Sequence, residues 1–150
     1  MNRLVLLVVL VGGCRSFAVT TPPGYVALND QEPLYQYRAT TADGVVLAVR
    51  TVDNDPHGDE SFWIEAIKNR MRTLGGYAFL EGRAVKCQSG ITGQQLLFGH
   101  DEGASPHLYY LTIFVTSKNL YLLEAGGPRP LIERDGPKLE AFVTTFVPSS

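Results

Sequence analysis

The sequence predicts an α+β fold, an antiparallel sheet with helices on both faces, which is a three-layer α/β/α sandwich. Four β-type runs follow one another between residues 77 and 125. Two segments with helical periodicity, 58–76 and 134–147, stand before and after these runs. The run LYYLTIFVT at 108–116 is apolar on both faces, which is typical of a strand covered on both sides. One helix on each side of the sheet satisfies all three observations.

The first strands are indicated by a turn signal between β-rich runs. Residues 25–28 are expected to form a short edge strand. In LYQYRATTADGVVLAVRTVDN, the pair Asp43-Gly44 separates two such runs, and this is a strong short-range signal for a hairpin. The strands of this hairpin are expected at 34–41 and 45–52.

The segment GDESFWIEAIKNRMRTLGG has the pattern of an amphipathic helix with one buried face. Asp59 or Ser61 can accept hydrogen bonds from the free amides of the first turn, and Gly75-Gly76 ends the helix. The buried stripe is expected to comprise Trp63, Ile67, Met71 and Leu74, widened by Phe62 and Ala66. An aromatic stripe of this kind also suits a ligand site, but packing against the sheet is the favoured interpretation.

The four β-type runs after the helix predict an antiparallel meander. They are residues 77–87, 91–99, 108–116 and 120–125. The short connection SKN at 117–119 predicts that the last two runs pair with each other. Within the third run, alternation points Leu108, Tyr110 and Phe114 to one face and Tyr109, Leu111, Ile113 and Val115 to the other.

A second helix is expected near the end of the chain, in RDGPKLEAFVTTFV. Asp135 or Gly136 can cap it, and Pro137 suits the first turn because proline has no amide hydrogen to leave unpaired there. The apolar stripe of this helix is Leu139, Phe142, Val143 and Phe146.

The N-terminal stretch MNRLVLLVVLVGGCRS has the layout of a secretory signal. Arg3 precedes an unbroken run of Leu and Val at 4–11, which is shorter than the ~20 residues that span a bilayer. Two glycines then provide the small residues that suit a cleavage site. We therefore expect residues 1–13 to be a signal peptide. The alternative is that the apolar run is a buried first strand and Cys14 an incidental thiol.

The sequence VGGC at 11–14 resembles the lipobox of bacterial lipoproteins, in which the Cys thiol is linked to diacylglycerol before cleavage. The resemblance implies a mature chain that begins at Cys14 and carries an N-acyl group such as palmitate. Two or more acyl chains hold a protein stably on a membrane. Residues 14–23 would then be the lipidated Cys and a polar tether, and residues 24–150 one globular domain. Arg15, rather than the Asp of inner-membrane lipoproteins, favours the outer membrane facing the periplasm.

The composition argues against a nucleic-acid-binding protein. Loss of Arg3 with the signal leaves 12 basic against 15 acidic residues, a net charge of −3 with histidine neutral. Nucleic-acid binders instead carry a basic surface. If Cys14 is lipidated, Cys87 has no partner within the chain. We expect Cys87 to be a small buried apolar residue, with a reactive or intermolecularly bridged thiol as the alternative.

The loop DNDPHGDE contains three carboxylates at a metal-ligand spacing. Asp53, Asp55 and Asp59 stand at the first, third and seventh positions of an EF-hand-like loop, with His57 at the fifth. Such a loop also needs a bidentate Glu at the twelfth position, where this chain has Ile64. Because Asp59 can cap the following helix, a solvated turn and helix cap is preferred to a weak calcium site.

Two histidines flank a second candidate site in GHDEGASPHLYY. If the strands on either side pair, His100 and His107 can approach each other, with Asp101 and Glu102 near them. This group suits Zn²⁺ and gives an alternative function, a lipid-anchored metal-dependent hydrolase that uses the 99–107 loop. The chain has neither HExxH nor GxSxG, so we favour no metal, no cofactor and no catalysis.

The order of hairpin, helix, meander and C-terminal helix is similar to that of the PsbP-like family. The resemblance is carried by LYYLTIFVTSKNLYLLEAGG and by a final helix ending AFVTTFV, and it covers about residues 25–147. This family contains the extrinsic PsbP subunit of photosystem II and many bacterial envelope lipoproteins. The resemblance implies an accessory-binding role and transfers no active-site residue. The expected function is therefore a non-catalytic envelope module that binds a protein or a small molecule.

Overall fold

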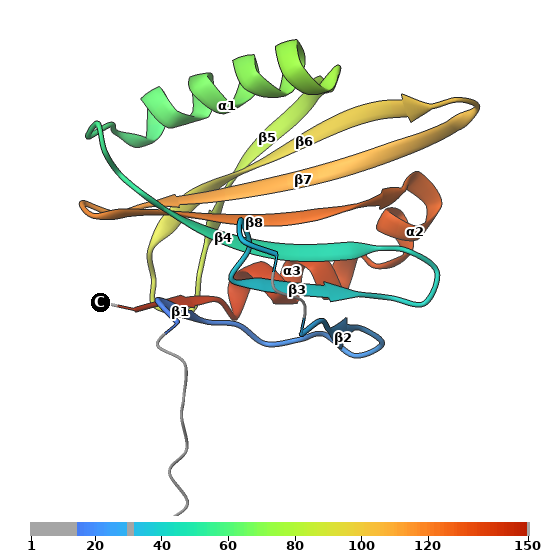
Figure 1. Cartoon of the computed structure of the whole chain (residues 1–150), viewed down its shortest axis with the longest axis horizontal. Coiled ribbons are helices and arrows are strands. Elements are labelled where there is room, and N and C mark those ends of the chain that lie inside the picture. The colour runs from blue at the N-terminus through green and yellow to red at the C-terminus, as the bar shows by residue number, and fades with distance from the viewer. Residues whose placement is uncertain (1–14, 30–31, 150) are drawn as a thin grey trace, which may run out of the picture.

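The computed structural model describes residues 15–29 and 32–149, and its centre is a seven-stranded antiparallel sheet (Figure 1). In spatial order the strands are β2 (Val26–Ala27), β3 (Tyr37–Thr40), β4 (Val46–Asp53), β8 (Asn119–Pro128), β7 (Ser105–Val115), β6 (Thr92–Glu102) and β5 (Ala78–Lys86). The predicted α+β class, the first edge strand, the hairpin and the meander are thereby confirmed.

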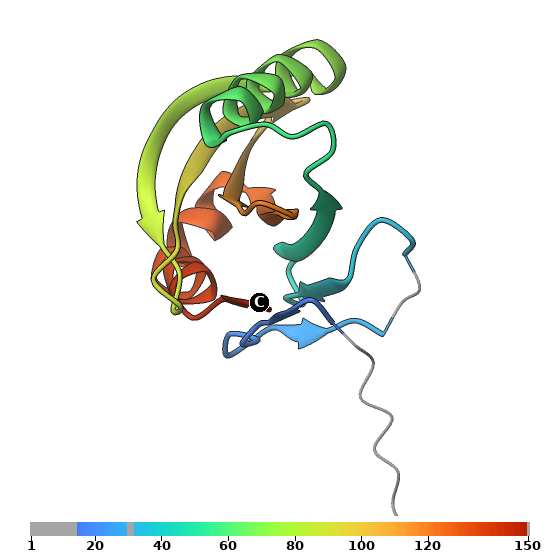
Figure 2. The ribbon, with the colours of Figure 1, turned by 90° about the vertical axis from the view of Figure 1, so that its left-hand side faces the viewer.

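Helices lie on both faces of this sheet, but the two outer layers are unequal. On one face α1 (Glu60–Gly75) lies over the β5–β6–β7 side, and none of its residues is fully buried. On the other face lie α2 (Arg129–Arg134) and α3 (Gly136–Thr144). Figure 2 shows the sheet curving between α1 and α3, with β5 along its outer margin. The expected three-layer sandwich is therefore confirmed only in part, because the layer formed by α1 buries none of its residues fully.

The core on the α3 side contains every residue of the predicted C-terminal stripe. Leu139, Phe142, Val143 and Phe146 are all buried, although α3 ends at Thr144, earlier than expected, so Phe146 lies beyond the helix. The Phe146 ring stacks on Phe114 of β7 with centroids 5.8 Å apart. The two faces of β7 are also as predicted, because Leu108, Tyr110 and Phe114 belong to this core and Tyr109, Leu111, Ile113 and Val115 belong to the cluster beneath α1.

Helix α1 begins and ends where the sequence predicts. The Asp59 side chain accepts a hydrogen bond from the Phe62 amide at 2.9 Å, and Gly76 closes the helix at a φ of 65°. The predicted stripe is wrong at two positions, because Leu74 is 72% exposed and Phe62 is 53% exposed. Tyr77, just beyond the helix, packs against the sheet cluster there instead.

The turn between β3 and β4 is stabilised by Thr41, whose hydroxyl accepts a hydrogen bond from the Val45 amide at 3.0 Å and donates one to Asp43 at 2.6 Å. Gly44 has a φ of 101°, a conformation that residues with a side chain rarely adopt. The hairpin strands start at Tyr37 and Val46, slightly later than expected.

The expected polar tether is wrong. Residues 16–23 are part of the folded domain, because β1 (Phe17–Ala18) pairs antiparallel with β9 (Val147–Pro148) in a separate two-stranded sheet. Phe17 is only 4% exposed and its ring lies 5.6 Å from that of Phe146. The expected signal peptide and Cys14 lie outside the described residues. In the described part of the chain, no helix is long and apolar enough to cross a membrane.

Three of the four meander strands are longer than expected, whereas β5 is slightly shorter. Strands β6 and β7 continue to Glu102 and Ser105 and meet at a tight turn, so residues 99–107 form a hairpin end and not an open loop. Strand β8 runs through Gly126 and Gly127 to Pro128, so these glycines lie inside the strand. The short helix α2 follows directly and was not expected.

Candidate functional site

The best-built candidate site is a pocket on the α1 side of the sheet, beyond the part that α1 covers. Its volume is about 250 Å³. We call it the tyrosine pocket, and its lining residues are Tyr35, Arg38, Val46, Ala48, Tyr77, Glu102, His107, Leu108, Tyr109, Glu124, Gly126 and Gly127. These residues come from β3, β4, β6, β7, β8 and two connecting segments, so the register of the sheet assembles the pocket.

A buried carboxylate forms the floor of the tyrosine pocket. Glu124 lies in the middle of β8, is 5% exposed and forms an ion pair with Arg50 of the neighbouring strand β4. A carboxylate in such a place is costly unless a cation and hydrogen-bond donors compensate for its lost water. Arg50 provides the charge, and its Nε has no hydrogen-bond partner among the described residues.

Two phenols complete the surroundings of Glu124. Burial is the main cause that raises the pKa of Tyr109, and the negative charge of Glu124 and a hydrogen bond to it add to the effect. The same causes raise the pKa of Tyr35. Both phenols are therefore neutral at physiological pH and serve as hydrogen-bond donors. The guanidinium carbons of Arg50 and Arg38 lie 5.5 and 5.7 Å from the centroid of the Tyr35 ring.

The rim of the pocket is aromatic. The Tyr77 ring lies 4.9 Å from the His100 ring and 5.6 Å from the Tyr109 ring. Tyr109 lies across Gly126, where an added Cβ would be 3.1 Å from the ring. Glycine at this position therefore lets the tyrosine lie close to the sheet. The pocket thus combines flat aromatic walls with a buried carboxylate whose charge the half-buried Arg50 neutralises, an arrangement that suits binding by stacking and hydrogen bonding.

Asn54 organises the 53–60 segment. Its Nδ2 donates to the carbonyls of Gly58 and Thr116 at 3.1 and 2.9 Å, and its Oδ1 accepts from the Gly58 amide and the Trp63 indole, both at 2.9 Å. Asp59 caps α1, and the Phe62 amide it binds lowers the pKa of this carboxyl.

The two other carboxylates of that segment, Asp53 and Asp55, are exposed. Asn54 is not among the residues expected to act in this segment, although an asparagine between two aspartates at a strand end is a typical turn signal.

The second sequence candidate is only partly assembled. His100 and His107 are direct partners in the β6–β7 register, as expected. The His107 Nε2 lies 3.8 Å from a Glu102 carboxylate oxygen. Asp101 points to the opposite face from His100, because successive strand residues alternate. Among residues 15–29 and 32–149, no group of three or more His, Cys, Asp or Glu side chains is arranged to hold a metal ion.

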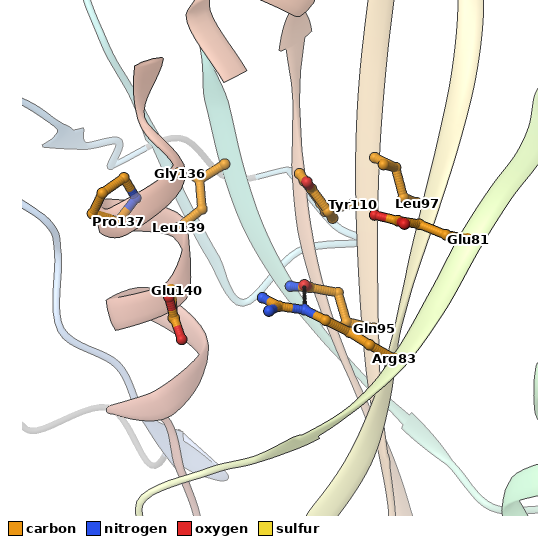
Figure 3. Close-up of a pocket in the computed structure, with 9 residues that line it drawn as sticks. All are labelled: Glu81, Arg83, Gln95, Leu97, Tyr110, Gly136, Pro137, Leu139 and Glu140. Carbon is orange, nitrogen blue, oxygen red and sulfur yellow. Dashed lines mark hydrogen bonds between the residues drawn. The ribbon is translucent and has the colours of Figure 1, made fainter. Parts of the chain in front are cut away.

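A second hollow lies on the opposite face, between α3 and the β5 side of the sheet. We call it the α3 groove; its volume is about 370 Å³ (Figure 3). Glu81 and Arg83 of β5 line one wall, and Pro137 and Glu140 of α3 line the other. The Arg83 Nε donates a hydrogen bond to Gln95 Oε1 at 2.9 Å.

Sequence reasoning missed the central residues of the tyrosine pocket. The available signal was a lone charge inside an apolar run, which applies to Arg50 in VVLAVRTV and to Glu124 in LYLLEAGG. The expectation for Cys87 is confirmed, since this thiol is free and buried.

Comparison with known proteins supports the fold and leaves the function open. No protein-family model matches the chain, and no curated protein matches it by sequence. Among solved structures, it is similar to LpqN, described as involved in cell envelope biogenesis of Mycobacterium tuberculosis, with a TM-score of 0.70 and 12% identity over 88% of this chain and 83% of that one.

Two further structures have the same fold. The cyanobacterial PsbP of Synechocystis sp. PCC 6803 matches with a TM-score of 0.61 and 10% identity, covering 89% of this chain and 86% of that chain. A putative regulator of unknown function from Pseudomonas aeruginosa matches with a TM-score of 0.57 and 9% identity, covering 93% and 88%. The expected PsbP-like fold is confirmed, and at these identities the likeness shows the fold alone.

Proposed function

We propose that this chain, which has the PsbP-like fold, is a bacterial envelope lipoprotein whose domain binds a partner and catalyses no reaction. The proposed anchor is a lipid on Cys14, and the proposed location is the outer membrane facing the periplasm. The VGGC sequence supports the anchor, and the shared fold with LpqN, a protein of cell envelope biogenesis, supports the location.

The binding role is carried by one observation, the tyrosine pocket. Its polar floor is already neutralised by the Arg50–Glu124 pair, and its walls are the rings of Tyr35, Tyr77 and Tyr109. Tyrosines offer large rigid contact areas at a low cost in side-chain entropy, and they are enriched at binding hot spots. The proposed partner is an envelope protein or a small molecule with a flat apolar face, and not a nucleic acid.

The anchor is tested by replacing Cys14 with serine. Serine cannot form the thioether to diacylglycerol, so Cys14→Ser is expected to move the protein out of the washed membrane fraction. A Cys87→Ser variant is the matched control and should stay with the membranes, because that thiol is buried. Immunoblots of membrane and soluble fractions measure the result, and mass spectrometry of the natural protein checks the lipid directly. Membrane retention of Cys14→Ser would show that the anchor is wrong.

The binding site is tested with Tyr35→Ala. A central aromatic contact is typically worth enough to change affinity about tenfold or more. Material that copurifies with the native protein from its envelope, quantified by mass spectrometry, should therefore fall by about that factor. Phe62→Ala is the control, because Phe62 is an exposed ring outside the pocket. Equal recovery from both variants, with circular dichroism showing that both fold, would contradict the assignment of the tyrosine pocket.

A further inference from the structure

Strand β5 forms one edge of the main sheet. It is nine residues long and pairs with β6 on one side only. All of its residues are exposed except Val85, which is half-buried. The opposite edge, β2, has only two residues. A long exposed edge presents unpaired backbone groups that can pair with another strand, and proteins usually shorten or cover such edges.

The charges of β5 are arranged so that two antiparallel copies of the strand, centred on Gly82, would complement each other. Glu81 and Arg83 flank this glycine and lie on the same face, where both line the α3 groove (Figure 3). If two copies of β5 pair antiparallel with Gly82 opposite Gly82, Glu81 of each copy lies opposite Arg83 of the other. We propose that the occupant of this edge is a second copy of the chain, paired through β5 about a two-fold axis at Gly82.

The charges are available for this pairing. Within the described residues, Glu81 has no ion-pair partner within 4 Å, and the only engaged nitrogen of Arg83 is the Nε bound to Gln95. The two terminal nitrogens of Arg83 are therefore available for a carboxylate. Two-fold symmetry forms the Glu81–Arg83 pair twice, and opposite charges at facing positions of an antiparallel pair stabilise it.

The bulge in β5 also fits the pairing. Phe79 pairs with Phe98 and Glu81 with Leu97, so Leu80 is the extra residue. Phe79 therefore lies on the α1 face, where Lys68 Nζ is 4.4 Å from its ring centroid. Allowing for the same bulge in both copies, Phe79 faces Ala84 of the other copy, whose small side chain leaves room for the ring. Phe79 is 43% exposed, so the pairing covers apolar surface as well as charges.

The first test places a cysteine on the proposed axis. In Gly82→Cys the new Cβ comes 3.3 Å from a terminal methyl of Leu96, which can adjust, and the native Cys87 is buried. Facing residues have Cβ atoms about 5 Å apart, within reach of a short thiol-specific cross-linker. The full-length variant, cross-linked in its native membrane, should yield a band at twice the chain mass. The control Ala104→Cys, in the exposed β6–β7 turn, should not.

The second test exchanges the charges in the Gly82→Cys background. Glu81→Arg brings like charges together twice, and the cross-linked yield is expected to fall about tenfold. The double variant Glu81→Arg/Arg83→Glu restores the opposite charges and should restore the yield. Glu32→Arg, an exposed reversal outside β5, is the control and should change nothing.

Two outcomes would overturn the proposal. One is equal cross-linking at positions 82 and 104, and the other is loss of yield in the exchanged double variant while circular dichroism shows a folded chain. A cross-linked band at a different mass would mean that a segment of another protein occupies the edge, and this result also rejects the second copy.

Discussion

Glu124 is a buried carboxylate in the middle of β8. It lies in an otherwise apolar strand, and the ion pair with Arg50 and the hydroxyls of Tyr35 and Tyr109 surround its carboxylate. Removing one partner of a buried ion pair leaves an uncompensated charge, and this costs far more than the pair itself contributes. The same side chain therefore shapes the tyrosine pocket and ties β4 to β8.

Arg50→Met tests this arrangement at the level of a single residue. Methionine keeps much of the side-chain volume but leaves Glu124 buried without a cation, so we expect the free energy of unfolding to fall by about 3 kcal/mol. The matched control is Arg129→Met, which breaks an exposed ion pair with Glu133 and should cost less than about 1 kcal/mol. Urea denaturation measures both. Similar losses for the two variants would mean that Glu124 is not held by Arg50.

At the level of elements, the sequence predicts the features that neighbouring residues determine but not those that distant residues determine. The cap at Asp59, the end of α1 at Gly76 and the stripe of α3 depend on neighbouring residues, so the sequence contains their signals. The tyrosine pocket depends on the register that brings Arg50 to Glu124, 74 residues later. No local pattern specifies such a register.

The missed pairing of β1 with β9 has the same cause, since the first and last strands are two residues long and have no periodicity of their own. The six-residue helix α2 is likewise too short to show a stripe, and Ile132 is its only buried residue. For this reason the sequence predicts a tether at 16–23, although Phe17 is in the core.

For helix α1, the structure and the sequence pattern predict different effects of mutation on stability. Trp63 and Leu74 belong to the same predicted stripe, but Trp63 is half-buried and hydrogen-bonded to Asn54, whereas Leu74 is exposed. Trp63→Ala should therefore lower the free energy of unfolding by about 3 kcal/mol, through lost packing and a lost hydrogen bond. Leu74→Ala should change it by less than about 0.5 kcal/mol. Thermal denaturation of both variants checks this. Equal losses of stability would mean that Leu74 is buried beside Trp63, as the sequence pattern predicts.

At the scale of the whole molecule, a polar network joins the start of the domain to the α2–α3 junction. The Tyr25 hydroxyl donates to Asp135 at 2.7 Å across 110 residues of chain. Arg134 bridges Asp135, at 2.8 Å, and Asp43 in the β3–β4 turn, at 2.5 Å. Three segments that are distant in sequence are thereby fixed to one another at one corner of the fold.

This network predicts sensitivity to acid. The hydrogen bond from Arg134, supported by Thr41, lowers the pKa of Asp43 to about 2, and Arg134 also lowers the pKa of Asp135. A carboxyl with a lowered folded-state pKa stabilises the fold above its ordinary pKa of 3.8 and loses this contribution as the pH falls towards about 2. The free energy of unfolding should therefore decline across this interval, and less steeply in Asp43→Asn. Urea titrations at several pH values measure the slopes, and identical slopes would exclude Asp43 as a contributor.

The pairing of β1 with β9 also has a consequence for the order of assembly (Figure 1). Ribosomes make β1 before β9, so Phe17 cannot take its place beside Phe146 until β9 has been made. A chain cut short before Val147 would leave that phenylalanine without its final covering strand. The two-stranded sheet therefore forms only in a chain that contains both β1 and β9.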